Sequence, residues 1–191
     1  MVAADSLYPA GTEWLADVGL GPPHRGTFGD LRVWVAETAF PAWPVAEARD
    51  LSLNCRKGEN LVNHRCVLSC AEIEIVRRFR RTGWKAGWLA TCGKRNPAWR
   101  DFMYTPAAPK RSVLDVPIKV LPPDLAALVL RGGPSGWPDV IAWDASRAQV
   151  VFVETKGPGD GGTNQVPWIA QMRRARRLRF NQFVRVDWTL R

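Results

Sequence analysis

Two apolar runs rich in β-branched residues, 140–143 and 150–153, are separated by a short polar segment. Such runs predict buried strands, and the polar segment between them predicts the turn of a hairpin. Both runs carry charge where a plain core strand would not, because Asp139 opens the first and Glu154 and Lys156 end the second. Alternate residues of a strand point to the same face, so Glu154 and Lys156 share a face. The hairpin would bring Asp139 beside Glu154.

Two carboxylates and a lysine at one sheet edge predict a metal site. Like charges a few ångströms apart are unfavourable unless a cation joins them, and Mg²⁺ prefers carboxylate oxygens with open water positions. A bound metal polarises a phosphoryl oxygen and activates water, while a nearby lysine positions that water or stabilises developing negative charge. The alternative is a structural salt bridge at a hairpin end. The combination of Pro138-Asp139 with Glu154-Thr155-Lys156 after four apolar residues favours the metal site.

A longer motif extends this hairpin towards the C-terminus. It consists of Val153-Glu154-Thr155-Lys156-Gly157-Pro158-Gly159-Asp160, followed by Asn164-Gln165-Val166-Pro167-Trp168-Ile169. This motif resembles the PD-(D/E)XK nuclease superfamily and, more narrowly, the VRR-NUC (virus-type replication-repair nuclease) family, with its E-x-K-G-P-x-D and a glutamine that opens a helix. The resemblance covers about the C-terminal two-thirds of the chain and does not extend to the first 65 residues or so.

The resemblance implies an α/β fold with a restriction-endonuclease-like αβββαβ core, in which helices flank a central mixed sheet. The nuclease domain would span residues 69–191, with a long connection at 93–136 that is rich in proline and glycine. Residues 1–68 would form a small N-terminal accessory segment, either a cap or a completion of the core.

The same resemblance implies roles for individual residues. Asp139 and Glu154 would hold Mg²⁺, for which Mn²⁺ would substitute, with help from Glu72 and the backbone carbonyl of Thr155. Lys156 would orient or activate the attacking water. Gln165, at the start of the helix that follows, would support the site near the metal or the scissile phosphate.

Glu72 lies in the strongest helical pattern of the chain, residues 69–83. Ser69 and Glu72 form a capping-box pattern and Gly83 suits the position just after the helix, so Glu72 has a purely structural alternative role. The pattern also resembles that of archaeal Holliday-junction resolvases, where the first glutamate helps bind metal. Glu72 and Glu74 lie about 200° apart on a helical wheel, and Glu72 shares the apolar face, so we expect Glu72 to face the site.

Local patterns predict further elements around this core. They are a helix over 12–18, strands over 31–35 and 84–91, a helix over 123–131, a helix from 163 or 164 onward, and a strand over 182–188. From the helix over 69–83 onward, the order of the core elements is one helix, three strands that include the two of the hairpin, one helix and one strand. This order agrees with the core implied by the resemblance.

The net charge of +9 is distributed unevenly. Residues 1–68 hold six Lys/Arg against eight Asp/Glu, whereas residues 69–191 hold 21 against 10. A basic surface around carboxylates fits a polyanionic substrate, although charge alone also serves solubility. The candidate contacts to nucleic acid are Arg173, Arg174, Arg176, Arg177, Lys94 and Arg95. The four C-terminal arginines could equally form a solvated helix end that contacts no phosphate. Lys94 and Arg95 could equally lie on a surface loop that contacts no nucleic acid.

Four cysteines in 191 residues do not indicate a disulfide scaffold and suit a reducing, intracellular (cytoplasmic) compartment. Cys55, His64, Cys66 and Cys70 lack the spacing of a zinc knuckle, so buried free thiols are the commoner reading and zinc the rarer one. No apolar run is long enough for a transmembrane helix, and the N-terminus lacks the pattern of a signal peptide. We therefore expect no membrane partner.

These observations predict a metal-dependent endonuclease that hydrolyses DNA phosphodiesters and leaves a 5′-phosphate, as the resemblance implies; RNA carries the same phosphodiester. Related proteins act on junctions or flaps, and cleavage of a junction would require a homodimer that matches its two-fold symmetry. No base-reading motif is evident, so backbone and shape recognition is expected. The alternatives are a non-catalytic nucleic-acid-binding module with a nuclease-like fold, and a DNA-targeting module for a separate partner.

Overall fold

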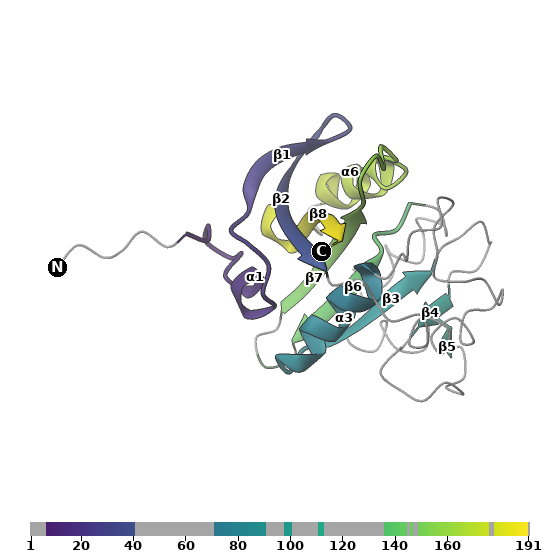
Figure 1. Ribbon diagram of the computed structural model, residues 1–191. Coiled ribbons are helices and arrows are strands. Elements are labelled where there is room, and N and C mark those ends of the chain that lie inside the picture. Colours follow the sequence, from purple (N-terminus) through teal and green to yellow (C-terminus); the bar gives the residue numbers. More distant parts are fainter. Residues whose placement is uncertain are drawn as a thin grey trace.

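A mixed eight-stranded sheet organises the described part of the chain, in the strand order β1-β2-β8-β7-β6-β3-β4-β5 (Figure 1). The computed structural model describes residues 7–40, 71–90, 98–100, 111–112, 136–144, 146, 149–175 and 178–190. The strands are β1 (His24–Phe28), β2 (Leu31–Phe40), β3 (Lys85–Ala90), β4 (Ala98–Arg100), β5 (Arg111–Ser112), β6 (Val140–Asp144), β7 (Gln149–Lys156) and β8 (Phe183–Leu190). The described helices are α1 (Trp14–Asp17), α3 (Ala71–Arg81) and α6 (Val166–Arg174), with a 3-10 turn at Phe180–Gln182.

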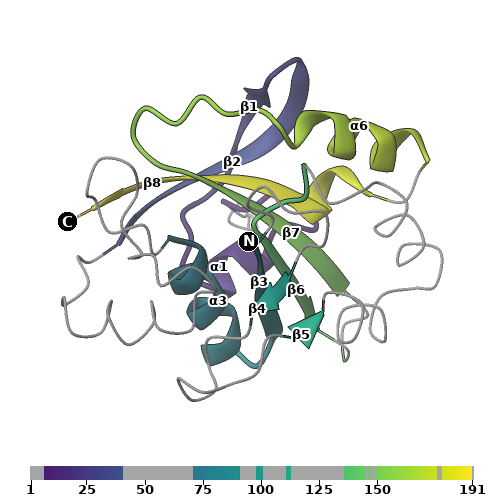
Figure 2. The same cartoon turned by 90° about the vertical axis from the view of Figure 1, so that its right-hand side faces the viewer.

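Helices cover both faces of this sheet (Figure 2). One core contains α1 and α3 packed on the sheet and includes Trp14, Ile75 and Phe79. The other core lies beneath α6 and includes Phe152 and Trp168, whose rings meet edge to face at 5.2 Å. Alternate residues of β7 belong to opposite cores, as the pleat requires. The chain is therefore a three-layer α/β structure, which confirms the predicted fold class at this level.

The predicted hairpin is formed by β6 and β7, which pair antiparallel with Val140 opposite Val153. Continuing this register by one residue sets Asp139 opposite Glu154. β7 then pairs in parallel with β8, and α6 connects the two strands across one face, as a parallel connection requires. The site residues of the motif therefore lie in the centre of the sheet, where strands flank β7 on both sides.

Helix α3 ends as its sequence predicts. Gly83 has φ of 87°, the amide of Trp84 donates to the carbonyl of Phe79, and the amide of Gly83 donates to the carbonyl of Arg80. This pair of bonds is the Schellman motif, which satisfies carbonyls at the end of a helix. The chain reverses there and enters β3, which pairs with β6. The turn thus fixes α3 over the strand next to the hairpin.

The N-terminal part of the chain belongs to the same sheet. β2 pairs in parallel with β8 from Trp34 to Phe40, and β1 pairs with β2 at the sheet edge. β1 is not evident in the sequence, because four of its five residues are at least partly exposed and polar or glycine. β2 is longer than the predicted strand. The described part of the N-terminal segment therefore completes the core.

Two arginines of α3 serve the fold. Arg78 donates to the carbonyl of Gly19 and to the hydroxyl of Thr38, and it lies over the ring of Phe40. Arg80 donates twice to the carbonyl of Ala86. These bonds connect α3 with the N-terminal segment and with β3. The guanidinium groups of Arg78 and Arg80 are thus engaged by the protein itself.

Several sequence predictions lie outside the described residues: the helix at 123–131, most of the connection at 93–136, and the four residues Cys55, His64, Cys66 and Cys70. β4 and β5 are two short strands within that connection. Over the described ranges, none of the helices is long and apolar enough to span a membrane.

Candidate active site

The site begins where β6 starts, at Asp139. Oδ2 of this carboxylate accepts two hydrogen bonds of 2.9 Å from Thr155, one from the backbone amide and one from the side-chain hydroxyl. These bonds anchor Asp139 to β7 one residue away from Glu154. This proximity follows from the antiparallel register of β6 and β7, which sets positions 139 and 154 opposite each other.

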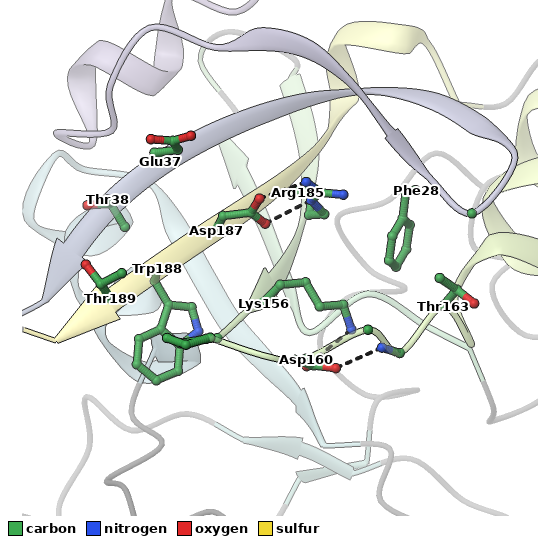
Figure 3. A pocket seen from close by; sticks show the side chains of 15 residues that line it. Phe28, Glu37, Thr38, Lys156, Asp160, Thr163, Arg185, Asp187, Trp188 and Thr189 are labelled. Carbon is green, nitrogen blue, oxygen red and sulfur yellow. Dashed lines mark hydrogen bonds and ion pairs between the residues drawn. The ribbon is translucent and has the colours of Figure 1, made fainter.

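Glu154 and Lys156 occupy the same face of β7 and form an ion pair. Nζ of Lys156 lies 2.8 Å from Oε1 of Glu154 and 3.5 Å from Oδ2 of Asp160, in the loop after the strand. Figure 3 shows the Lys156 side chain reaching towards Asp160 and Phe28, whose ring centroid lies 5.4 Å from Nζ. Glu154 is only 1% exposed. The single lysine therefore stands between two carboxylates, one of them buried.

Glu72 brings a third carboxylate to this edge from α3. Burial raises its pKa to about 8, and the negative charge of Asp139 contributes next, whereas the nearby Lys156 opposes the rise. Glu74 instead lies 3.6 Å from Nε of Arg78. Of the two glutamates on this turn, Glu72 is thus the one whose charge interacts with the hairpin residues.

The other two carboxyl groups of the site, Asp139 and Glu154, also have raised pKa values. Burial raises the pKa of Asp139, although its two bonds from Thr155 act against the rise. Burial and the charge of Asp139 raise the pKa of Glu154 well above its usual range. Desolvation lowers the pKa of Lys156, but its attraction to Glu154, Asp160 and Asp139 outweighs this and leaves the pKa raised. Lys156 is therefore an ammonium group at neutral pH, beside carboxyl groups that burial shifts towards their neutral form.

Gln165 precedes α6 and approaches the segment that leads into β6. A Cβ on Gly136 would lie 2.5 Å from the carbonyl oxygen of Asn164 and 3.7 Å from Cα of Gln165, so the two backbones are in close contact. Gly136 also has φ of 87°, a conformation that favours glycine. Oε1 of Gln165 is buried without a hydrogen-bond partner. The start of α6 is thus packed against the residues that position Asp139.

The carboxylate oxygens of this site are of the chemical kind that binds a divalent cation. Among the residues that the structure describes, no group of three or more His, Cys, Asp or Glu side chains is arranged to hold a metal ion. However, Oε2 of Glu154 is buried and has no hydrogen-bond partner, and an orphaned buried acceptor indicates a missing donor or cation. Three carboxylates with raised pKa values are the arrangement that a cation relieves.

The predicted contacts to nucleic acid are described only in part. Arg173 donates to the carbonyl of Arg32 at 2.6 Å and lies over the ring of Phe180, which holds α6 against β2. Burial lowers the pKa of Arg173. Arg174 is exposed. Lys94, Arg95, Arg176 and Arg177 lie outside the described residues.

Two residues near Lys156 were not predicted as site residues. Asp160 belongs to the quoted motif, and its position four residues after Lys156 was the signal that could have identified it. Phe28 comes from the N-terminal segment and reaches Lys156 only through the order of strands in the sheet. No local pattern in the sequence predicts the contact between Phe28 and Lys156.

Comparisons with known proteins give no relative for this chain. No family model matches it, and no curated protein or solved structure does. The function is therefore inferred from the residues of the site, their geometry and their electrostatics.

Proposed function

We propose that this protein is a metal-dependent endonuclease that hydrolyses phosphodiester bonds of DNA. The observation that carries the proposal is the pairing of Glu154 with Lys156 beside Asp139, with the charge of Glu72 on α3 interacting with those of Asp139 and Lys156. All three carboxylates have raised pKa values. Such strongly perturbed groups gathered at one place are typical of functional sites. The resemblance to VRR-NUC nucleases and to a restriction-endonuclease-like core supports the same assignment.

In this proposal Asp139, Glu154, Glu72 and the backbone carbonyl of Thr155 hold Mg²⁺ or Mn²⁺. The ion would polarise a phosphoryl oxygen and lower the pKa of a bound water. Within the protein, Thr155 fixes one oxygen of Asp139 through its two hydrogen bonds. Glu154 keeps one oxygen for Lys156 and leaves the other without a protein donor. The carboxylates are thereby oriented before any substrate binds.

The charge state of Lys156 defines its role. Since its pKa is raised, Lys156 carries a proton at neutral pH and acts as a hydrogen-bond donor. It would orient the attacking water and stabilise negative charge that develops on the phosphate. Gln165, whose side-chain oxygen is buried without a partner, would accept a hydrogen bond from the same water or from a ligand of the site. Because Lys156 is protonated, the general base that takes a proton from the attacking water would be a carboxylate or a solvent molecule.

The test is cleavage of labelled single-stranded, duplex, flap and four-way-junction DNA in Mg²⁺, Mn²⁺ or EDTA. We expect cutting in either metal and none in EDTA. Lys156→Ala should reduce the rate by about 10²–10³-fold, the effect typical of removing one group that stabilises transition-state charge. Lys85→Ala is the matched control, because Lys85 is exposed on β3 and lies outside the site.

Two results would contradict the proposal. If the wild-type protein binds these substrates without cutting any of them in either metal, it is a binding module with a nuclease-like fold. If cutting persists in Lys156→Ala at the rate of Lys85→Ala, the activity belongs to another part of the chain. Labelled RNA of the same sequences, run beside the DNA, would rank the two substrates.

A further inference from the structure

A pocket of about 690 Å³ adjoins the site on the side of the N-terminal strands. This volume lies within the range of roughly 300–1,000 Å³ that is typical of small-ligand sites. Lys156 and Asp160 form one end of the pocket together with Phe28, and Glu37 and Thr189 lie at the other end (Figure 3). Asp139, Glu154 and Glu72 are not among the lining residues. The pocket is thus a neighbour of the carboxylates and shares Lys156 with them.

The N-terminal segment builds one wall of this pocket. Phe28 comes from β1, and Glu37 and Thr38 come from β2, whereas the opposite wall is the glycine-rich loop after β7. β8 supplies the floor, because β2 and β7 both pair with it in parallel. The resemblance to nucleases does not cover β1 and β2. These two strands therefore add a feature to the site that the nuclease motif alone does not contain.

The cations of the pocket are already paired. Arg185 donates from Nε and Nη2 to the two oxygens of Asp187, at 2.8 and 2.7 Å, and from Nη1 to the carbonyl of Thr27. Lys156 is bound by Glu154 and Asp160. Among the described lining residues, three carboxylates face two cations, which leaves an excess of negative charge. A phosphate group in this pocket would meet repulsion, so its occupant is expected to be uncharged.

The free groups of the pocket are mainly acceptors and hydroxyls. Glu37 is exposed, and no described residue forms an ion pair with it. Thr189 is exposed as well. Phe28 and Trp188 supply aromatic surface and are themselves 3% and 7% exposed, so they are held rigidly; a Cβ on Gly157 would come within 3.0 Å of the Trp188 ring. The pocket thus offers a carboxylate acceptor and a small area of aromatic surface, which suit a flat ring that carries an amino group.

We propose that this pocket binds the base of an unpaired nucleotide next to the scissile phosphate. Carboxylates accept hydrogen bonds from the exocyclic amino group of cytosine, and single-stranded nucleic acid is commonly bound through aromatic surfaces that contact its bases. A base stacked within a duplex could not enter, so the pocket would favour single-stranded or frayed substrates over intact duplex. The position beside the scissile phosphate rests on the proposed nuclease function; binding of the base does not.

The first experiment measures binding of nucleosides without phosphate or metal. Saturation-transfer NMR in EDTA should show transfer from the protein to the base protons of deoxycytidine, at roughly millimolar affinity. Thymidine lacks the amino group and should bind more weakly. Inorganic phosphate at the same concentration should not displace deoxycytidine, because the net charge of the pocket repels it.

Two variants assign the binding to this pocket. Thr189→Trp fills the end near Glu37 and should weaken deoxycytidine binding by at least about tenfold, while Gln171→Trp adds the same ring to an exposed position of α6 outside the pocket and should not. Glu37→Gln should make deoxycytidine and thymidine bind alike. Equal binding by Thr189→Trp and Gln171→Trp, or displacement by phosphate, would overturn the pocket assignment.

Cleavage by the same variants separates this inference from the proposed function. In the nuclease, Thr189→Trp should lower the rate on single-stranded DNA and leave little difference between single strand and duplex. If Lys156→Ala abolishes cleavage while Thr189→Trp cuts like wild type, the nuclease assignment stands and the pocket inference falls. If deoxycytidine binds as expected but no DNA is cut, the pocket stands and the nuclease assignment falls.

Discussion

The carboxylate edge of the hairpin and the arginine face of α3 both bury charge, but they balance it differently. On α3, Glu74 is 7% exposed and lies near two arginines, with Nε of Arg78 at 3.6 Å and Nη1 of Arg81 at 4.0 Å. At the hairpin, Glu154 is 1% exposed and shares Lys156, its one ion-pair partner among the described residues, with Asp160. The first region is neutralised by the protein. The second has an excess of negative charge.

Under the proposed function, this difference separates the charges that serve the fold from those that serve chemistry. A buried carboxylate that has sufficient partners stabilises the native structure or is at least tolerated, whereas one without them raises the free energy of the protein. Proteins retain such costly arrangements mainly at functional sites. The many arginines of this chain are therefore a weaker indication of function than the few carboxylates at the hairpin. Arg78 and Arg80, which are bound to backbone carbonyls, illustrate the point.

The strongest test of this comparison replaces one glutamate in each region by its neutral isostere. Glu154→Gln should lower metal-dependent cleavage by about 10²–10³-fold, because it removes a ligand that the site needs. The thermal stability in EDTA should stay equal or rise, since the raised pKa of Glu154 shows that the fold favours its neutral form. Glu74→Gln should leave cleavage unchanged and destabilise the fold by about 1–2 kcal/mol, between the values for exposed and buried ion pairs.

Cleavage assays and thermal unfolding of both variants check this prediction. Addition of Mg²⁺ should raise the melting temperature of Glu74→Gln as it does that of the wild type, by an amount that grows with the ratio of metal concentration to Kd. Glu154→Gln should lack most of this increase. Loss of stability in Glu154→Gln together with full activity would show that Glu154 is a structural residue like Glu74.

A second test compares one glycine from each region. Gly136 and Gly83 have the same φ of 87°, so an alanine at either position incurs similar backbone strain, about 1–2 kcal/mol. A Cβ at Gly83 meets no atom within 4 Å, whereas at Gly136 it would lie 2.5 Å from the carbonyl oxygen of Asn164. Gly136→Ala should therefore be the less stable variant by about 1–3 kcal/mol. It should also cut more slowly, because the segment that precedes Asp139 must move.

Chemical denaturation and cleavage rates of the two alanine variants separate the effect of backbone strain from the effect of the steric contact with Asn164. Gly83→Ala supplies the strain alone and should keep the wild-type rate, because α3 ends there far along the helix from Glu72. Equal stability and equal rates in the two variants would mean that the start of α6 does not position Asp139.

The hairpin and α3 could be predicted from the sequence because their signals are local. Alternation along 149–156 puts Glu154 and Lys156 on one face, and the antiparallel register then sets Asp139 opposite Glu154. Gly83 marked the end of α3 for a conformational reason that any sequence shows. These residues define most of the candidate site. The separation of Glu72 from Glu74 also followed from helical geometry.

The rest depends on contacts between distant segments. β1 is a polar edge strand without apolar alternation, and its Phe28 reaches Lys156 only because β1 and β2 add to the sheet beside β8. The partners of Arg80 and Arg173 are backbone carbonyls, which every residue has, so no residue type indicates them. Sequence patterns therefore predicted which side chains lie together at the hairpin and left open the wall of the pocket beside it.

The last expected effect is on stability alone, namely its pH dependence without metal. The pKa of Glu72 is raised from 4.5 to about 8 in the folded protein, so the fold binds its proton more tightly than the unfolded chain does. The stabilising contribution is present below pH 4.5 and is lost as the pH rises towards 8. In EDTA the melting temperature should fall over this window, and Glu72→Gln should flatten the fall. Mg²⁺ should oppose the fall in the wild type, because a cation replaces the proton among the carboxylates. A pH profile that Glu72→Gln does not alter would mean that Glu72 lies apart from the charged edge, and would leave Asp139 and Glu154 as the two carboxylates available to a metal.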